Sequence, residues 1–243
     1  MTTLAARDRL IVALDVPAVA DARALVDTLG SEVTFYKVGL ELVMNGGLDL
    51  VRDLAQGGKK VFLDMKLLDI GNTVERAARS AAATGATFLT VHGHDRKTLA
   101  AALAGSAGTP LKILSVTVLT NLDAADLREQ GLGMEPEAAV VHRAKLAKSA
   151  GCGGVVASAL EAARVREVIG PGMAIVTPGI RLPGDAAGDQ SRVATPQIAI
   201  AAGADYIVAG RPVIAATDPR AAARNFVESI QEGLALRSLG SSG

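Results

Sequence analysis

Short apolar runs alternate along this chain with longer segments whose apolar residues recur at helical spacing. The first run, residues 10–15 (LIVALD), is continuously apolar up to Asp15, which is typical of a parallel strand buried on both faces. Seven later runs have the same texture and complete a set of eight predicted strands: 34–38, 60–66, 88–92, 112–117, 154–157, 174–177 and 206–209.

The segments between these runs are rich in alanine, and several end at a glycine, which commonly terminates a helix. Helices are predicted at 21–29, 48–56, 73–83, 97–104, 136–149, 160–168, 196–202 and 221–236. Eight strand–helix alternations in 243 residues favour a (β/α)8 TIM barrel, one α/β domain spanning residues 1–243. A doubly wound open sheet is the alternative, although it would usually need fewer strands. Residues 238–243 are small and polar and are expected to form a flexible tail.

Composition narrows the class of protein. The 25 basic and 25 acidic residues balance, and aromatic residues make up only 2%, so nothing favours a nucleic-acid partner. No apolar run approaches the roughly 20 residues that cross a bilayer, and no export signal is visible at the start, so no membrane partner is expected. The single cysteine, Cys152, excludes an intramolecular disulfide, and we expect a cytoplasmic protein.

The strongest chemical signal lies at the end of the third predicted strand. Asp64 and Lys66 are two residues apart, so on a regular strand they point to the same face, and Asp69 follows in the next loop. A surface ion pair is the plainer interpretation of such a pair. The apolar residues before it place this strand in the core, where burying charge is costly unless the charges are paired.

Other predicted strands contribute polar groups at the same end of a barrel. Asp15 ends the first strand, and Lys37 lies inside the apolar second one. Gly210 ends the eighth strand, where it allows a close backbone approach, and Arg211 starts a short helical segment. Arg181 follows the seventh strand. Each cation alone could be a solvated surface charge, but their shared placement favours a phosphate site.

Two connections are longer than a barrel requires, residues 120–135 and 178–195. Both follow the carboxyl end of a strand, where barrel active sites are built, so we interpret them as binding loops, with 178–195 as a candidate lid.

The motif D-x-K-x-x-D-I-x-N-T at 64–73 resembles the signature of the orotidine 5'-phosphate decarboxylase family. LIVALDV at 10–16, YKVGLEL at 36–42, TPGIR at 177–181 and the Gly210-Arg211 pair follow in the family's order, so the resemblance covers nearly the whole chain. Two positions depart from it: Leu68 stands where the family commonly has histidine, and Gly71 where it has proline.

The resemblance implies decarboxylation of orotidine 5'-monophosphate to UMP, with no cofactor and no metal. Lys66 would protonate C6, Asp64 would lie beside the substrate carboxylate, and Lys37 and Asp69 would complete an alternating charge array. The active site would be shared across a homodimer, because Asp69 would reach the neighbouring subunit's site. The implied substrate contacts are Asp15 and Thr73 for the ribose, Thr120 for the pyrimidine, and Arg181, Gln190, Gly210 and Arg211 for the loop and phosphate.

Two other functions compete with this one. Sugar-phosphate enzymes resembling 3-keto-gulonate-6-phosphate decarboxylase or hexulose-phosphate synthase share D-x-K-x-x-D but need Mg²⁺, which Lys37 would repel. The second alternative is a catalytically inactive phosphate-binding or assembly protein on a barrel scaffold, which would have no use for a buried charge array. His92 and His94 suggest a metal pair only weakly, because no third ligand is suitably spaced, and Cys152 is interpreted as a small core residue.

Overall fold

The computed structural model describes residues 4–183 and 194–240 of the chain, and it contains a closed barrel of eight parallel strands. The strands pair in sequence order, and β8 closes the barrel on β1. Their bounds are β1 Leu10–Ala13, β2 Phe35–Gly39, β3 Lys60–Leu67, β4 Phe88–His92, β5 Lys112–Val116, β6 Gly154–Val156, β7 Ala174–Thr177 and β8 Tyr206–Ala209. All eight predicted strands are confirmed, and the (β/α)8 fold with them.

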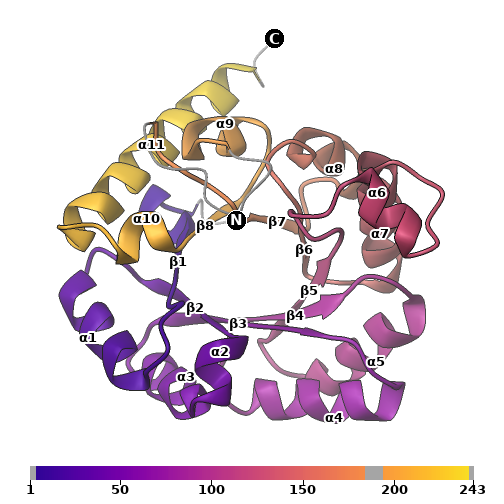
Figure 1. The fold of residues 1–243 in the computed structure, drawn as a ribbon, viewed down its shortest axis with the longest axis horizontal. Helices are drawn as coiled ribbons and strands as arrows, with labels where there is room; N and C mark the ends of the chain where they lie inside the picture. Colours follow the sequence, from indigo (N-terminus) through magenta and orange to yellow (C-terminus); the bar gives the residue numbers. More distant parts are fainter. Residues whose placement is uncertain (1–3, 184–193, 241–243) are drawn as a thin grey trace.

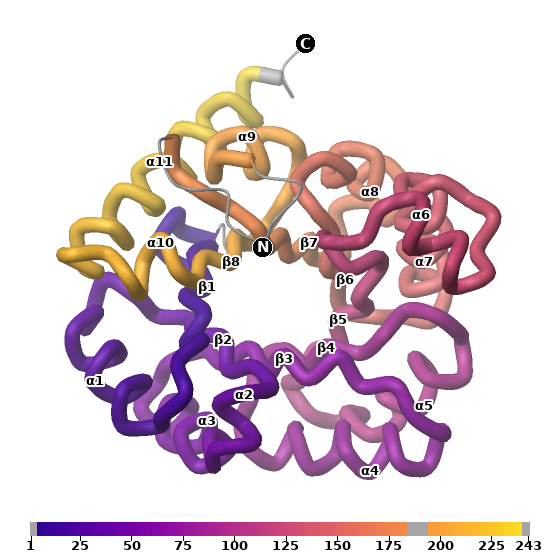
Figure 2. The backbone as a smooth tube through the Cα atoms, in the orientation of Figure 1, coloured from indigo at the N-terminus to yellow at the C-terminus, as the bar shows by residue number. Residues whose placement is uncertain are grey.

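The helices surround the barrel, so that the strands form an inner ring and the helices an outer one (Figure 1). Their bounds are η1 Ala6–Arg9, α1 Val19–Leu29, α2 Leu40–Met44, α3 Gly47–Gln56, α4 Gly71–Ala82, α5 Arg96–Ser106, α6 Ala124–Glu129, α7 Pro136–Ala150, α8 Ala162–Ile169, α9 Pro196–Ala201, α10 Arg211–Ile214 and α11 Pro219–Gly240. The chain passes once around this ring, which brings α1 against α11 (Figure 2). No helix in the described part of the chain combines the length and apolarity needed to cross a membrane.

The structure differs from the sequence expectation at several connections. The predicted loop 120–135 contains α6, whose first turn is closed by a reciprocal cap: Asp123 accepts from the backbone of Asp126, and Asp126 accepts from the backbone of Asp123. The short helix α2 was not predicted. Helix α11 continues to Gly240, three residues into the segment expected to be a flexible tail.

Two apolar layers hold the barrel together. The larger packs the outward side chains of the strands against the helices. The smaller fills the barrel interior and includes Phe35, Phe62 and Phe88, with Tyr206 packed against it. The rings of Phe35 and Phe88 have centroids 5.2 Å apart, and Tyr206 meets both rings edge to face. Phe62 of this cluster, the interior plug, also lines a pocket at the carboxyl ends of the strands.

Candidate active site

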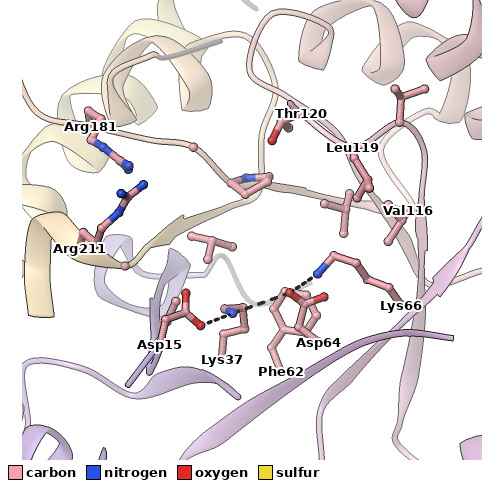
Figure 3. A pocket seen from close by; sticks show the side chains of 17 residues that line it. Asp15, Lys37, Phe62, Asp64, Lys66, Val116, Leu119, Thr120, Arg181 and Arg211 are labelled. Atoms are coloured by element: carbon pink, nitrogen blue, oxygen red, sulfur yellow. Dashed lines mark hydrogen bonds and ion pairs between the residues drawn. The ribbon is translucent and has the colours of Figure 1, made fainter. Parts of the chain in front are cut away.

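A cavity of about 450 Å³ opens at the carboxyl end of the barrel, with Phe62 of the interior plug among its lining residues. That volume is in the range of small-molecule sites. Its polar lining comes from the ends of β1, β2, β3, β5, β7 and β8, the edge where catalytic residues of such barrels collect. Figure 3 shows acids and lysines along one side and two arginines at the other end.

The acids and lysines alternate in one connected row, Asp15, Lys37, Asp64 and Lys66 (Figure 3). Lys37 Nζ lies 2.7 Å from Asp15 Oδ1 and 3.8 Å from Asp64 Oδ2, and Lys66 Nζ lies 2.7 Å from the same Asp64 oxygen. The side chains of Lys37 and Asp64 are only 11% and 12% exposed, whereas that of Lys66 is 31% exposed. Three of the four predicted array residues therefore meet, and Asp15 joins them as a fourth member.

The pairing of β2 with β3 makes room for Lys37. Gly39 lies opposite Asp64 in the register, and a Cβ added at Gly39 would come 2.9 Å from Lys37 Nζ. Any larger residue there would displace the ammonium group from between its two carboxylates. This role of Gly39 is not predictable from the sequence, since a glycine at a strand end does not show whether the side chain of a neighbouring lysine folds back over it.

An irregularity in β3 sets the position of Lys66. The register between β3 and β4 shifts between Leu63 and Leu67, and Lys66 has a φ of 48°, a left-handed conformation that is uncommon for residues with a side chain. The simple alternation of a regular strand, which the sequence analysis assumed, therefore does not describe this segment. Lys66 still reaches Asp64, but through a bulged backbone.

The environment of Asp64 keeps it ionised. Burial by itself would raise the pKa of this carboxyl, but the charges of Lys37 and Lys66 and hydrogen bonds from Lys66 and Thr90 outweigh burial, so the pKa lies below its usual value. Burial and the charge of His94 lower the pKa of the nearby His92 to about 4, so that His92 is neutral at pH 7.

Arg181 and Arg211 extend toward each other at the far end of the cavity, above Asp15 (Figure 3). Arg181 is buried, and its Nη1 donates to the carbonyl of Ile180 at 2.9 Å. Gly210 and Thr120 also line the cavity. Two guanidinium groups facing one space can bind a dianion such as a phosphate monoester.

Some of the expected site residues lie elsewhere in the single chain. Asp69 is exposed and lines a separate surface groove, where its Oδ1 accepts a hydrogen bond from the backbone of Ile70. Thr73 is exposed in the first turn of α4. Gln190 and most of the candidate lid lie outside the described residues. The single chain therefore brings together the array without Asp69.

The remaining residues with candidate chemistry are His92, His94 and Cys152. The rings of His92 and His94 are 4.8 Å apart between centroids, but in the described ranges no group of three His, Cys, Asp or Glu side chains is placed to hold a metal ion. Burial raises the pKa of the Cys152 thiol to about 12, which makes it a poor nucleophile, in agreement with its interpretation as a core residue.

Comparison with known proteins agrees with this geometry. Residues 8–226 match the family model described as "Orotidine 5'-phosphate decarboxylase / HUMPS family". A Bradyrhizobium protein named orotidine 5'-phosphate decarboxylase is 54% identical over 235 residues, covering 97% of this chain and 96% of that protein. One from Afipia carboxidovorans with the same name is 55% identical over 224 residues, covering 92% and 95%.

A solved structure gives the same result. The crystal structure of orotidine 5'-phosphate decarboxylase from Lactobacillus acidophilus superposes with a TM-score of 0.82 at 38% identity, covering 92% of this chain and 99% of that one. The family model by itself spans more than one activity, but the Bradyrhizobium and Afipia carboxidovorans proteins, which match over nearly the whole length, carry the same name. The chain therefore belongs to the orotidine 5'-phosphate decarboxylase / HUMPS family, as an enzyme of the carboxy-lyase class.

Proposed function

We propose that this chain removes CO2 from orotidine 5'-monophosphate to form UMP, the last step of pyrimidine synthesis de novo, without a metal ion or cofactor. The observation that supports this most is the row Asp15, Lys37, Asp64 and Lys66 lining one cavity with two arginines. The two arginines at one end suit a phosphate, and Lys66 at the other end would offer an ammonium group to a carbanion of the bound substrate.

Lys66 is the group proposed to act on the reacting carbon. When the bond between C6 and the carboxyl carbon breaks, its electron pair stays on C6, which has no adjacent electron sink. An ammonium group fixed beside C6 stabilises this charge more in the transition state than in the substrate, and it then donates a proton to C6. Lys66 is left as a neutral amine, which takes up a proton from water before the next turnover.

Asp64 and Lys37 are proposed to keep that ammonium group in place. Asp64 accepts from Lys66 at 2.7 Å and lies against Lys37 on its other side, so one carboxylate oxygen is shared between two lysines. Such a preformed arrangement needs no reorganisation when the charge develops. Arg181 and Arg211 would bind the 5'-phosphate and supply binding energy remote from the reacting carbon.

We also propose that the active form is a homodimer in which Asp69 and Thr73 enter the neighbouring subunit's site. Asp69 is flanked by Leu68 and Ile70, which are 53% and 74% exposed in the single chain. Large exposed apolar side chains beside an acid that lies outside the cavity of its own chain are typical of a surface that another chain covers. In a two-fold symmetric pair each site would receive the same residues from its partner.

The reaction is tested by following the loss of orotidine 5'-monophosphate absorbance, with and without a chelator. We expect turnover that the chelator does not change. Activity that the chelator abolishes and Mg²⁺ restores would favour the metal-dependent sugar-phosphate enzymes instead.

The role of Lys66 is tested by Lys66→Ala, with Lys60→Ala at the opposite end of the same strand as the control. General acid catalysis contributes about 10²–10⁴-fold and electrostatic stabilisation about 10²–10³-fold, so we expect a loss of at least 10⁴-fold in kcat with the fold intact. Lys60→Ala should keep full turnover. Undiminished turnover in Lys66→Ala would refute the assigned role.

The shared site is tested by co-expressing Lys66→Ala with Asp69→Ala, each inactive alone. In a mixed dimer, one site would combine the intact Lys66 of one chain with the intact Asp69 of the other. Random pairing would restore about one quarter of all sites. If the mixed dimers are no more active than either single variant, this would argue against an active site shared between subunits.

A further inference from the structure

Thr90 on β4 lies where β3 departs from regular pairing. In the register, Leu63 pairs with Leu89, and Leu67 pairs with Val91, so three residues of β3 lie opposite Thr90 alone. Those three residues include Asp64 and Lys66. A bulge of this kind leaves backbone groups of the longer strand without their normal partners in the ladder.

The Thr90 hydroxyl supplies a hydrogen-bond partner for the backbone of β3 at this bulge. Lys66 N donates to Thr90 Oγ1 at 3.0 Å, and Thr90 Oγ1 donates to Asp64 Oδ1 at 2.8 Å. The direction of both bonds is fixed, because the amide can only donate and the ionised carboxylate can only accept. Thr90 is fully buried, so water does not compete for either bond.

These two bonds act on both catalytic partners at once. The bond to the backbone of Lys66 helps hold the left-handed conformation, φ 48°, from which its side chain reaches Asp64. The bond to Asp64 occupies Oδ1 and leaves Oδ2 to face Lys66 and Lys37. Thr90 itself is absent from the cavity lining.

We propose that Thr90 is a positioning residue for the decarboxylation, one hydroxyl that fixes the Lys66 backbone and the Asp64 carboxylate relative to each other. This inference rests on the proposed roles of Lys66 and Asp64. Since Thr90 does not line the cavity, its loss changes the placement of the ammonium group and leaves the phosphate end unaltered.

The test compares Thr90→Val, which keeps the shape and removes the hydroxyl, with Thr90→Ser, which keeps the hydroxyl. The matched control is Thr87→Val, because Thr87 Oγ1 also accepts a hydrogen bond from the backbone of β3, at Val61 N, but far from the charges. We expect kcat to fall about tenfold to hundredfold in Thr90→Val, the range for lost hydrogen bonds to a charged group, with KM within about twofold. Thr90→Ser should recover most of kcat, and Thr87→Val should keep it.

Equal kcat in Thr90→Val and the parent enzyme, or an equal loss in Thr87→Val, would overturn the inference. Should Thr90→Val not fold, Thr90→Cys is compared with Thr90→Ser, because a thiol of similar size is a weak donor and acceptor; equal kcat values then overturn it. The parent enzyme and Lys66→Ala show which of the proposals a negative result concerns. If the parent enzyme does not turn over orotidine 5'-monophosphate, the proposed function fails. If Lys66→Ala keeps the activity of the parent, the role of Lys66 fails, and the inference with it. Loss in Lys66→Ala with no loss in Thr90→Val refutes only the role of Thr90.

Discussion

Replacing Asp64 with asparagine removes one negative charge from between two lysines while keeping the size of the side chain. In the native site Asp64 accepts from Lys66 at 2.7 Å and from Thr90 at 2.8 Å, and Lys37 lies 3.8 Å away. The amide can still accept from Thr90. Its NH₂ group would then point at Lys66, so that two donors face each other.

The expected cost follows from these distances. With an effective dielectric constant of about 20, the charge attractions correspond to about 6 kcal/mol at 2.7 Å and about 4 kcal/mol at 3.8 Å. Most of this is offset by desolvation, and removing one partner of a buried pair typically costs about 3–5 kcal/mol. Because Lys66 is 31% exposed, solvent screens part of the interaction and we expect the lower end, about 3 kcal/mol. For a chain of this size that lowers Tm by about 6–12 °C.

The pH dependence has a definite sign. The pKa of Asp64 is lowered in the folded protein, so its contribution to stability is present above the unfolded value of about 3.9 and is lost as the pH falls through the folded value. The Tm difference between the parent and Asp64→Asn should therefore be full at pH 7 and shrink below about pH 4.

The assay is thermal unfolding of both proteins at one protein concentration between pH 7 and pH 3. Asp49→Asn is the control, because its ion pair with Arg52 is exposed on α3 and should change stability by less than about 1 kcal/mol. A Tm for Asp64→Asn within 2 °C of the parent at pH 7 would refute the reasoning, as would a Tm difference that is unchanged at pH 3.

Three further outcomes are expected. Native Cys152 should resist iodoacetamide at pH 8 and react in urea, because burial raises the pKa of its thiol to about 12; labelling of the native protein, read by mass spectrometry, would contradict this. Gly105→Ala should lower stability by about 1–3 kcal/mol in urea unfolding, since its Cβ would lie 2.1 Å from a carbonyl oxygen of α4, whereas Gly172→Ala, with open space, should not; equal stabilities would be evidence against this packing. Arg211→Ala should raise the KM for orotidine 5'-monophosphate about tenfold to hundredfold in steady-state assays, and an unchanged KM would remove Arg211 from the phosphate site.

Much of the fold could be predicted because it depends on local patterns. Continuous apolar runs such as residues 10–15 are typical of strands buried on both faces, and eight of them separated by helical segments permit few architectures. The helix α6 was missed although its signal is also local: Asp123 and Asp126 have the spacing of a reciprocal cap. Beyond the predicted end of α11, Arg237 donates to the carbonyl of Ala204, a contact between distant segments that no local pattern of small and polar residues indicates.

For the site, the sequence by itself determined which charges are available and at which end of the barrel they lie. Lys37 lies in β2, and Asp64 and Lys66 lie toward the carboxyl end of the neighbouring β3, so their proximity was predictable. The pairing of Asp15 with Lys37 and the space that Gly39 leaves were decided only by the tertiary structure, because both depend on how β1, β2 and β3 lie side by side.

Thr90 is the clearest case of a residue whose role only the tertiary structure decided. In the sequence it is an ordinary β-branched residue in an apolar strand, 24 positions from Lys66. Only the register shift between β3 and β4 places its hydroxyl between a backbone amide and a carboxylate. The periodicity of the sequence indicates to which face of a strand a side chain points. A hydrogen bond across a bulge depends instead on the relative position of two strands, which no local pattern encodes.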